Sequence, residues 1–288
     1  MSGKILVVDY QSPSAGKDLV QSLTHTGFAI LKSVPVEQVL IDEVYTHWKA
    51  FFHSNQKFHY PFNPTTMDGF ASTAVSEVAK GYDKKDLKEF FHYLEAGRCP
   101  DGLRGITSKF VQQLNPIAQQ LLQWIENGLP ADILNGLSEP LTGMITGSNN
   151  SKLRLIHYPP LTGDEPEGAL RAAAHEDINL ITLLPAATAE GLQVLSAECA
   201  WLDVGSDPGS IIINAGDMLA ECTNGFIKST THRVVNPVGA AAREGRMSMP
   251  FFVHPRSEVR LSSRHTAQSY REERYNENGL VTNKMTVS

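Results

Sequence analysis

Two hydrophobic patterns divide the chain near its middle. Up to about residue 150, apolar residues recur at intervals of three and four, the spacing that places them on one face of a helix. This pattern predicts helices over residues 16–26, 35–58 and 103–127, and a shorter helix that begins at Asp132. After Asn149-Asn150-Ser151, short apolar runs alternate with turn-forming residues, which is typical of β-strands. The chain is therefore expected to combine a largely helical first half with a β-rich second half.

The β-rich half is predicted to form a sandwich of short strands. These strands are expected near residues 152–158, 170–184, 191–196, 210–214, 227–235 and 246–254. Two further strands, at residues 5–9 and 28–31, are expected to flank the first helix. Asn224-Gly225 is a dipeptide favoured in tight hairpin turns, so it is expected to join two strands. Short strands at this spacing indicate a sandwich or jelly roll.

The remaining segments have weaker patterns. Residues 61–102 are rich in Pro, Gly, Asp and Lys, and they are expected to be irregular and to fold over the mouth of the barrel. The charge run from Lys84 to Glu89 within them is expected to be a solvated surface. The tail after Arg260 is polar, with a helix expected around residues 271–274.

Composition describes an ordinary soluble globular protein. The chain has 288 residues, enough for one large core or two modest ones, with 41% hydrophobic and 19% charged residues. A net charge of −6 gives no electrostatic reason to expect nucleic acid or an acidic membrane as a partner. No apolar run is long enough to cross a bilayer, and the N-terminal sequence does not resemble a signal peptide. A cytoplasmic location is therefore expected.

The three cysteines agree with that location. Cys99, Cys199 and Cys222 are scattered, with no Cys-x-x-Cys pair among them. This arrangement argues against a disulfide framework and against a thiolate zinc site. A reducing compartment is the simpler interpretation.

The candidate chemistry lies between residues 171 and 248. His175 and Asp177 are two residues apart, so on a strand they would point to the same face, about 6–7 Å apart at their backbones. With His232 from a distant strand they form the two-histidine, one-carboxylate set of non-haem Fe(II) oxygenases. The alternative is a buried, hydrogen-bonded His–Asp pair and an unrelated histidine. The motifs that follow favour the iron site.

Several motifs match one family in order. They are Leu155-Ile156-His157-Tyr158-Pro159-Pro160, Gly191-Leu192-Gln193-Val194, Asn214-Ala215-Gly216-Asp217, Ser229-Thr230-Thr231-His232-Arg233-Val234 and Arg246-Met247-Ser248. Over roughly residues 3–260 the sequence resembles the isopenicillin N synthase-like branch of the 2-oxoglutarate/Fe(II)-dependent dioxygenases. The resemblance is specific in the C-terminal half and general in the N-terminal half.

The resemblance implies a fold and a domain organisation. It implies an α+β protein with a mainly β core, a double-stranded β-helix or jelly roll supported by N-terminal helices. Residues 1–150 would then form a mixed helical region packed on the barrel, and residues 151–260 would form the dioxygenase core. Residues 261–288 would be a polar tail, and the whole chain would be one compact unit.

The resemblance also implies a cosubstrate site. Besides the iron ligands His175, Asp177 and His232, it assigns Arg246 and Ser248 to the far carboxylate of 2-oxoglutarate, with Tyr158 reaching the same cosubstrate. A guanidinium fork suits a carboxylate because it donates two parallel hydrogen bonds. A surface salt bridge for Arg246 and a packing role for Tyr158 are the alternatives.

Two further positions bear on ligand binding. Ile156 stands where many plant members carry Asn, so that auxiliary contact is absent. Arg171 is in phase with His175, so it is expected to face the pocket and meet an acidic group of the substrate or of 2-oxoglutarate. A solvated arginine at the end of a strand is the alternative.

The function implied is oxidation of a small molecule with Fe(II), 2-oxoglutarate and O2, yielding succinate and CO2. Hydroxylation, desaturation and cyclisation share this iron centre. One alternative is an oxidase like isopenicillin N synthase, which uses no 2-oxoglutarate. Another is a non-catalytic sensor that binds iron or 2-oxoglutarate, although a protein without catalysis need not retain the whole set of site residues. Consumption of 2-oxoglutarate separates the three.

Overall fold

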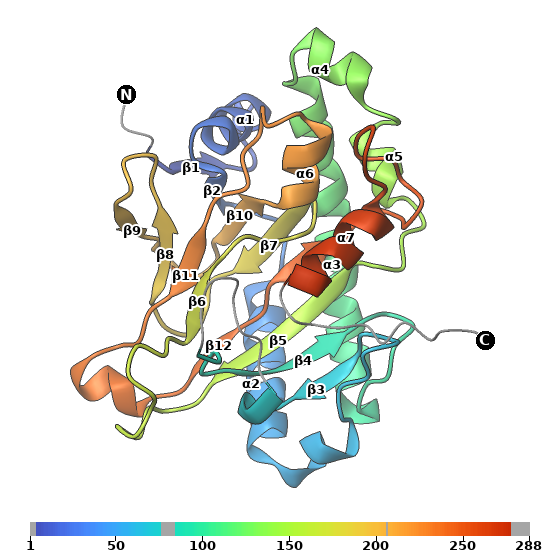
Figure 1. Ribbon diagram of the computed structural model, residues 1–288. Helices are drawn as coiled ribbons and strands as arrows, with labels where there is room; N and C mark the ends of the chain where they lie inside the picture. The colour runs from blue at the N-terminus through green and yellow to red at the C-terminus, as the bar shows by residue number, and fades with distance from the viewer. Residues whose placement is uncertain (1–3, 76–83, 206, 278–288) are drawn as a thin grey trace.

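A computed structural model describes residues 4–75, 84–205 and 207–277, and helices cover one face of its larger sheet (Figure 1). The helices are α1 (Ala15–Thr26), α2 (Gln38–His53), α3 (Asp101–Asn127), α4 (Ala131–Gly136), α5 (Leu141–Ile145), α6 (Asp217–Cys222) and α7 (Ala267–Glu277), with 3-10 turns η1 (Asn55–His59), η2 (Thr73–Val75) and η3 (Gly239–Arg243). The helices expected at 16–26 and 103–127, and the short one at Asp132, are confirmed as α1, α3 and α4.

Strands of the described residues form two sheets. The larger follows the order β1 (Leu6–Asp9), β2 (Phe28–Lys32), β10 (Ile211–Ala215), β7 (Ile181–Pro185), β13 (Phe251–Val253), β5 (Lys152–Tyr158), β4 (Glu89–Tyr93) and β3 (Gly69–Ala71), with β12 (Arg246–Ser248) also beside β5. The smaller follows the order β6 (Ala172–His175), β11 (His232–Val234), β8 (Leu192–Leu195) and β9 (Trp201–Asp203). The molecule is thus a mixed α and β protein built on one large sheet.

Each face of the larger sheet has its own apolar core. Alternation along β5 points Leu153 and Leu155 toward the side covered by helices α1, α2 and α3. Ile156 and Tyr158, at the other parity, belong to a second cluster that includes Leu192 and Val234 of the smaller sheet. The space between the two sheets is therefore lined from both sides by side chains, and the candidate site lies there.

Residues before 150 supply both edges of the larger sheet. β2 pairs antiparallel with β10, and β1 adds in parallel outside it. At the other edge, β4 pairs with β5 and β3 follows. Gly27 permits the tight turn from α1 into β2, because its φ is +70°, and a Cβ there would lie 2.3 Å from Thr230 Oγ1 in the segment before β11.

Three expected elements are each divided, and the strand expected over 246–254 is interrupted at Met249-Pro250, between β12 and β13. The helix expected over 35–58 ends at His53, because Ser54 adopts an extended backbone. The Ser54 side chain accepts a hydrogen bond from Gln56 N, and this bond caps the 3-10 turn η1 that follows. The strand expected over 170–184 is two strands, β6 and β7, which belong to different sheets. An apolar run cannot reveal that the chain crosses between sheets within it.

The prediction of a hairpin turn at Asn224-Gly225 is wrong, because these residues follow the C-terminal end of α6. Both residues have positive φ, and Gly225 N donates to Ala220 O at 2.8 Å, which closes the C-terminal end of α6. A left-handed backbone is needed at helix ends as well as in hairpins, so the dipeptide alone did not distinguish them.

The charge run and the region around it are also more ordered than expected. Asp86 and Lys88 are each 4% exposed and Glu89 is 7% exposed, so the solvated surface is wrong for these three residues, whereas Lys85 is exposed. Glu89 begins β4, which lies inside the larger sheet between β3 and β5, and Lys88 just before it pairs with Asp86. Residues 76–83 of the expected irregular region lie outside the described residues, as do residues 278–288 of the tail. The helix expected around 271–274 is confirmed as α7.

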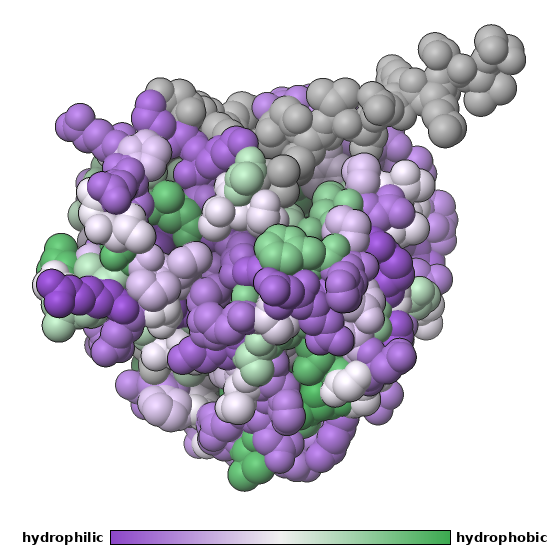
Figure 2. Space-filling model, turned by 90° about the horizontal axis from the view of Figure 1, so that it is seen from below, coloured by the Kyte–Doolittle hydropathy of each residue, from purple (hydrophilic) through white to green (hydrophobic). Residues whose placement is uncertain are grey.

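In the part of the chain that the structure describes, no helix is long and apolar enough to cross a bilayer. On the face drawn in Figure 2, hydrophobic residues lie in small groups separated by hydrophilic ones.

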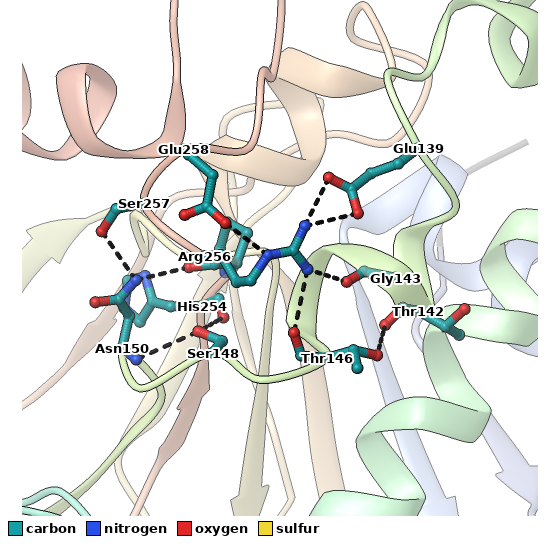
Figure 3. Close-up of polar contacts among 11 residues, drawn as sticks. Glu139, Thr142, Gly143, Thr146, Ser148, Asn150, His254, Arg256, Ser257 and Glu258 are labelled. Carbon is teal, nitrogen blue, oxygen red and sulfur yellow. Dashed lines mark hydrogen bonds and ion pairs between the residues drawn. The ribbon is translucent and has the colours of Figure 1, made fainter.

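A polar cluster around Arg256 joins the segment after β13 to the segment before β5 (Figure 3). Arg256 Nη2 lies 2.9 Å from both carboxylate oxygens of Glu139, and its Nε donates to Glu258 at 2.8 Å. Its Nη1 donates to the carbonyl oxygens of Gly143 and Thr146 at the C-terminal end of α5. One guanidinium therefore ties α5 to the chain that leaves the sheet.

Candidate metal centre and cosubstrate pocket

His175, Asp177 and His232 lie together between the two sheets. His175 ends β6, His232 begins β11, and the two residues are paired across these antiparallel strands. One ligand atom from each residue lies within 4.8 Å of the others, and Asp177 Oδ1 is 3.9 Å from His232 Nε2. Asp177 was expected on the same strand as His175, but it lies two residues beyond the end of β6. The loop between β6 and β7 therefore positions its carboxylate next to the two histidines.

Backbone carbonyls hold both imidazoles in one orientation. His175 Nδ1 lies 2.8 Å from Ala173 O, and His232 Nδ1 lies 3.1 Å from Thr230 O. Because a carbonyl only accepts, each Nδ1 carries the proton and each Nε2 keeps its lone pair. Burial, followed by the nearby His232, lowers the pKa of His175 to about 4. A neutral imidazole is the form that binds a metal.

Two buried donors hold the Asp177 carboxylate. Its Oδ2 accepts from Thr182 Oγ1 at 2.6 Å and from Asn214 Nδ2 at 2.7 Å, which leaves Oδ1 directed to the histidines. Burial alone would raise the pKa of Asp177, but the two imidazoles and these hydrogen bonds hold it below its usual value. Thr182 and Asn214 received no role from the sequence, although both are polar residues within otherwise apolar strands.

The backbone next to Gly216 fixes the loop that carries Asp177. Asp217 N donates to Asp177 O at 2.7 Å, and Gly216 N donates to Leu180 O at 2.9 Å. A Cβ at Gly216 would lie 2.2 Å from Asn179 O, so only glycine allows this approach. The Gly216-Asp217 turn thus supports the carboxylate of Asp177.

Arg246, Ser248 and Tyr158 line the same cavity as the metal-binding triad. Arg246 is paired with Tyr158 across β12 and β5, and Ser248 is on the same face as Arg246. The Arg246 guanidinium lies 5.0 Å from the Tyr158 ring, and its Nε donates to Ala189 O at 2.8 Å. Arg246 is 2% exposed, and its Nη1 has no hydrogen-bond partner within the described residues. The surface salt bridge considered for Arg246 is therefore wrong.

Arg171 is buried beside this pair. It is 1% exposed, so the solvated arginine considered from the sequence is wrong. Its Nη2 donates to Glu244 O at 2.8 Å, whereas its Nε finds no acceptor among the described residues. Burial, and then the charge of Arg246, lower the pKa of Arg171. Two like charges held together in a buried space favour an anion between or beside them.

Lys88 and Arg154 also line the cavity, and the sequence assigned neither of them to it. Lys88 forms an ion pair with Asp86 at 2.7 Å, and Asp86 also accepts from Ala173 N at 2.9 Å. The charge run that contains Lys88 therefore packs against the strand that carries His175. Its buried position depends on pairing between β4 and β5, which no local period reveals.

Comparisons with known proteins agree with this geometry. The model of the 2OG-Fe(II) oxygenase superfamily matches residues 149–255. A crystal structure of a 2OG-Fe(II) oxygenase family protein from Caulobacter crescentus is 30% identical, with 96% of this chain and 99% of that chain covered and a TM-score of 0.77. A Shewanella oneidensis protein assigned as an oxygenase is 46% identical, with 96% and 100% covered and a TM-score of 0.87.

A curated relative adds an activity. A 2-oxoglutarate-dependent dioxygenase of Dothideomycetidae sp. (strain 11243) is 29% identical over 252 residues, which are 77% of this chain and 72% of the relative. The chain belongs to the 2OG-Fe(II) oxygenase superfamily. It is an Fe(II)- and 2-oxoglutarate-dependent dioxygenase, an oxidoreductase with O2 as its oxidant.

Proposed function

We propose that His175, Asp177 and His232 hold the Fe(II) of this dioxygenase, and that the enzyme oxidises a small molecule between the two sheets. The observation that carries the proposal is the convergence of two Nε2 lone pairs and one ionised carboxylate oxygen in a buried space. Each ligand has its own supporting hydrogen bond, which fixes its orientation before the metal binds. The residues present therefore fit a ferrous ion.

For 2-oxoglutarate, we assign the far carboxylate to Arg246 and Ser248, with Tyr158 beside them. The proposal is supported by the buried Nη1 of Arg246, a charged donor that no described residue satisfies. Leaving such a donor unpaired costs about 1–3 kcal/mol, which a carboxylate would offset. Arg171 is assigned to the same end of the cosubstrate as a second positive charge, because its guanidinium lies 6.0 Å from the centre of the Tyr158 ring, on which the Arg246 guanidinium also lies.

The roles of the chain are to bind, orient and exclude water. When bound, iron with 2-oxoglutarate and O2 supplies the oxidation of the substrate, with succinate and CO2 as coproducts. His175, Asp177 and His232 would hold the metal through three ligand atoms, and the metal would keep open positions for 2-oxoglutarate and O2. Apolar side chains of both sheets, among them Phe28, Leu192 and Phe252, line the cavity and keep it dry.

At the level of the fold, we propose that the two sheets form the double-stranded β-helix of the dioxygenases. Residues 151–260 would be its core, residues 1–150 would pack on it within one structural unit, and residues 261–288 would be an appended tail. The two facing sheets with the site between them support this description. We also propose that the enzyme works in the cytoplasm, since its three free cysteines suit a reducing compartment.

The test uses anaerobic protein loaded with Fe(II). Addition of 2-oxoglutarate is expected to produce a weak visible charge-transfer band, and admission of O2 is expected to release succinate, measured by NMR. Slow uncoupled turnover should occur even without the substrate. A band without succinate would contradict catalysis, and succinate release that survives alanine at all three triad positions would contradict the ligand assignment.

A further inference from the structure

Asn179 is a fully buried amide in the loop between β6 and β7, two residues beyond Asp177. Its Nδ2 donates to Thr182 Oγ1 at 2.9 Å and to Ile181 O at 3.1 Å. Thr182 Oγ1 in turn donates to Asp177 Oδ2 at 2.6 Å. The three polar side chains therefore form a series of hydrogen bonds that ends on a proposed metal ligand.

The orientation of the Asn179 amide follows from its neighbours. Ile181 O is a carbonyl oxygen that only accepts, so the nitrogen of Asn179 is the atom that faces it. The amide oxygen, Oδ1, faces Gly216, where an added Cβ would clash with it. Oδ1 has no hydrogen-bond partner within the described residues. Asn179 is thus held for its two N–H groups, one directed to Ile181 and one to Thr182.

This amide decides where the hydroxyl of Thr182 places its single proton. Because Thr182 Oγ1 accepts from Asn179, its own proton is left for Asp177 Oδ2. The distance of 2.6 Å is typical of a hydroxyl that donates to an ionised carboxylate. A donor on the hydroxyl oxygen also polarises the hydroxyl and strengthens the bond that it makes. Without Asn179, the hydroxyl would be free to turn toward another acceptor.

The two carboxylate oxygens of Asp177 then have different tasks. Oδ2 accepts from Thr182 and Asn214, whereas Oδ1 lies 3.9 Å from His232 Nε2. We propose that Asn179 is a positioning residue of the metal centre: through Thr182 it keeps Oδ2 bound to the protein, so that Asp177 offers Oδ1 alone to Fe(II). This inference rests on the function proposed above. A carboxylate that offered both oxygens would take a position that 2-oxoglutarate or O2 needs.

A double-mutant cycle on Fe(II) affinity tests the series, because an effect that acts through Thr182 must vanish when the hydroxyl is removed. The Fe(II) dissociation constant is measured anaerobically, by competition with a coloured chelator, for the wild type, Asn179→Leu, Thr182→Val and the double variant. Asn179→Leu alone should lower the affinity about threefold to tenfold, within the loss expected for Thr182→Val. In the Thr182→Val protein, the same change should lower it less than about twofold.

Two controls separate positioning from general destabilisation. Thr182→Ser keeps the hydroxyl, so Asn179→Leu should retain its full effect on Fe(II) affinity in that background. Asn150→Leu removes an amide that donates to Pro255 O and Ser257 Oγ, none of which lines the cavity (Figure 3). It should lower the melting temperature of the metal-free protein and leave the Fe(II) dissociation constant unchanged.

The opposite outcomes are distinct. An unchanged Fe(II) affinity in Asn179→Leu, an equal loss with and without the Thr182 hydroxyl, or no loss in the Thr182→Ser background would each overturn this inference and leave the proposed function standing. If Asn179→Leu does not fold, Asn179→Ala takes its place in the cycle, since it removes the same donors without adding bulk beside Gly216. A wild-type protein that takes up no stoichiometric Fe(II) would overturn the proposed ligand set, and this inference with it.

Discussion

Arg246 and Arg256 stand close together in the sequence, on either side of β13, yet their surroundings differ. Every donor nitrogen of Arg256 meets an acceptor from the protein: Glu139, Glu258 and two carbonyl oxygens of α5 (Figure 3). Arg246 is buried, but its Nη1 has no acceptor within the described residues. The nearby buried Arg171 likewise has an Nε without an acceptor among those residues.

The difference separates structure from binding. A buried charged donor without a partner destabilises the folded protein in the absence of a ligand. Such a donor therefore indicates a role in binding rather than in stability. Arg256 uses its donors to join the segment around α5 to the segment after β13, whereas Arg246 and Arg171 retain donors that an anion can satisfy. If arginines with unpartnered donors bind ligands and arginines with satisfied donors stabilise the fold, substitutions at the two kinds of position should have different effects on binding of Fe(II) and 2-oxoglutarate.

The largest effect is expected at the metal. Alanine at His175, Asp177 or His232 should sharply reduce stoichiometric Fe(II) uptake, because each substitution removes one of the three proposed protein ligands. The far-ultraviolet circular dichroism should change little, since none of the three is part of an apolar core cluster. Metal content after gel filtration is the measurement. Full uptake by all three variants would contradict the assignment.

Arg246→Lys is expected to weaken 2-oxoglutarate binding by about 1–3 kcal/mol, the range for a hydrogen bond to a charged group. Lysine keeps the charge but gives up the two parallel hydrogen bonds of the guanidinium. The anaerobic charge-transfer band, titrated with 2-oxoglutarate, gives the dissociation constant. An unchanged constant would show that the unpartnered donor of Arg246 does not meet the cosubstrate.

Thr182→Val tests the support of the carboxylate. The substitution preserves shape and removes one of the two donors to Asp177 Oδ2, so Fe(II) affinity should fall by about tenfold, the lower end of the range for such supporting residues, because Asn214 remains. Thr223→Val is the matched control, since Thr223 is equally buried but donates to Leu219 O at the end of α6. Equal losses of iron affinity in both variants would point to general destabilisation.

The sequence predicted the elements with a strong local period, together with the residues that meet in the candidate site. Helices α1 and α3 and strand β5 follow from spacing alone, and the triad came from two short motifs, one that contains His175 and Asp177 and one that contains His232. Arg171 was expected at the pocket from its phase with His175. It is buried near the pocket for a different reason, because it precedes β6 and packs against Tyr158.

What the sequence did not reveal depends on distant pairing. Lys88 belongs to a charge run that looks solvated, yet it is buried just before β4, where it forms an ion pair with Asp86. Asn214 supports Asp177 from a strand that is 37 residues away, and Arg154 is oriented by His92, which is 62 residues away. Such contacts have no local period, so a single sequence gives no signal for them.

The smallest effect on ligand binding is expected at Arg256, whose donors are all satisfied by the protein. Arg256→Lys should leave the dissociation constants of Fe(II) and 2-oxoglutarate unchanged, because Arg256 contacts only the segments around α5 and β13. It should lower the melting temperature, since one ammonium cannot replace a fork that meets two carboxylates and two carbonyls at once. Arg246→Lys should show the reverse, weak cosubstrate binding with little change in melting temperature. The pair is measured by thermal denaturation and by titration of the charge-transfer band on the same preparations. If Arg256→Lys weakens 2-oxoglutarate binding as much as Arg246→Lys does, the presence of unused donors does not distinguish binding arginines from structural ones in this fold.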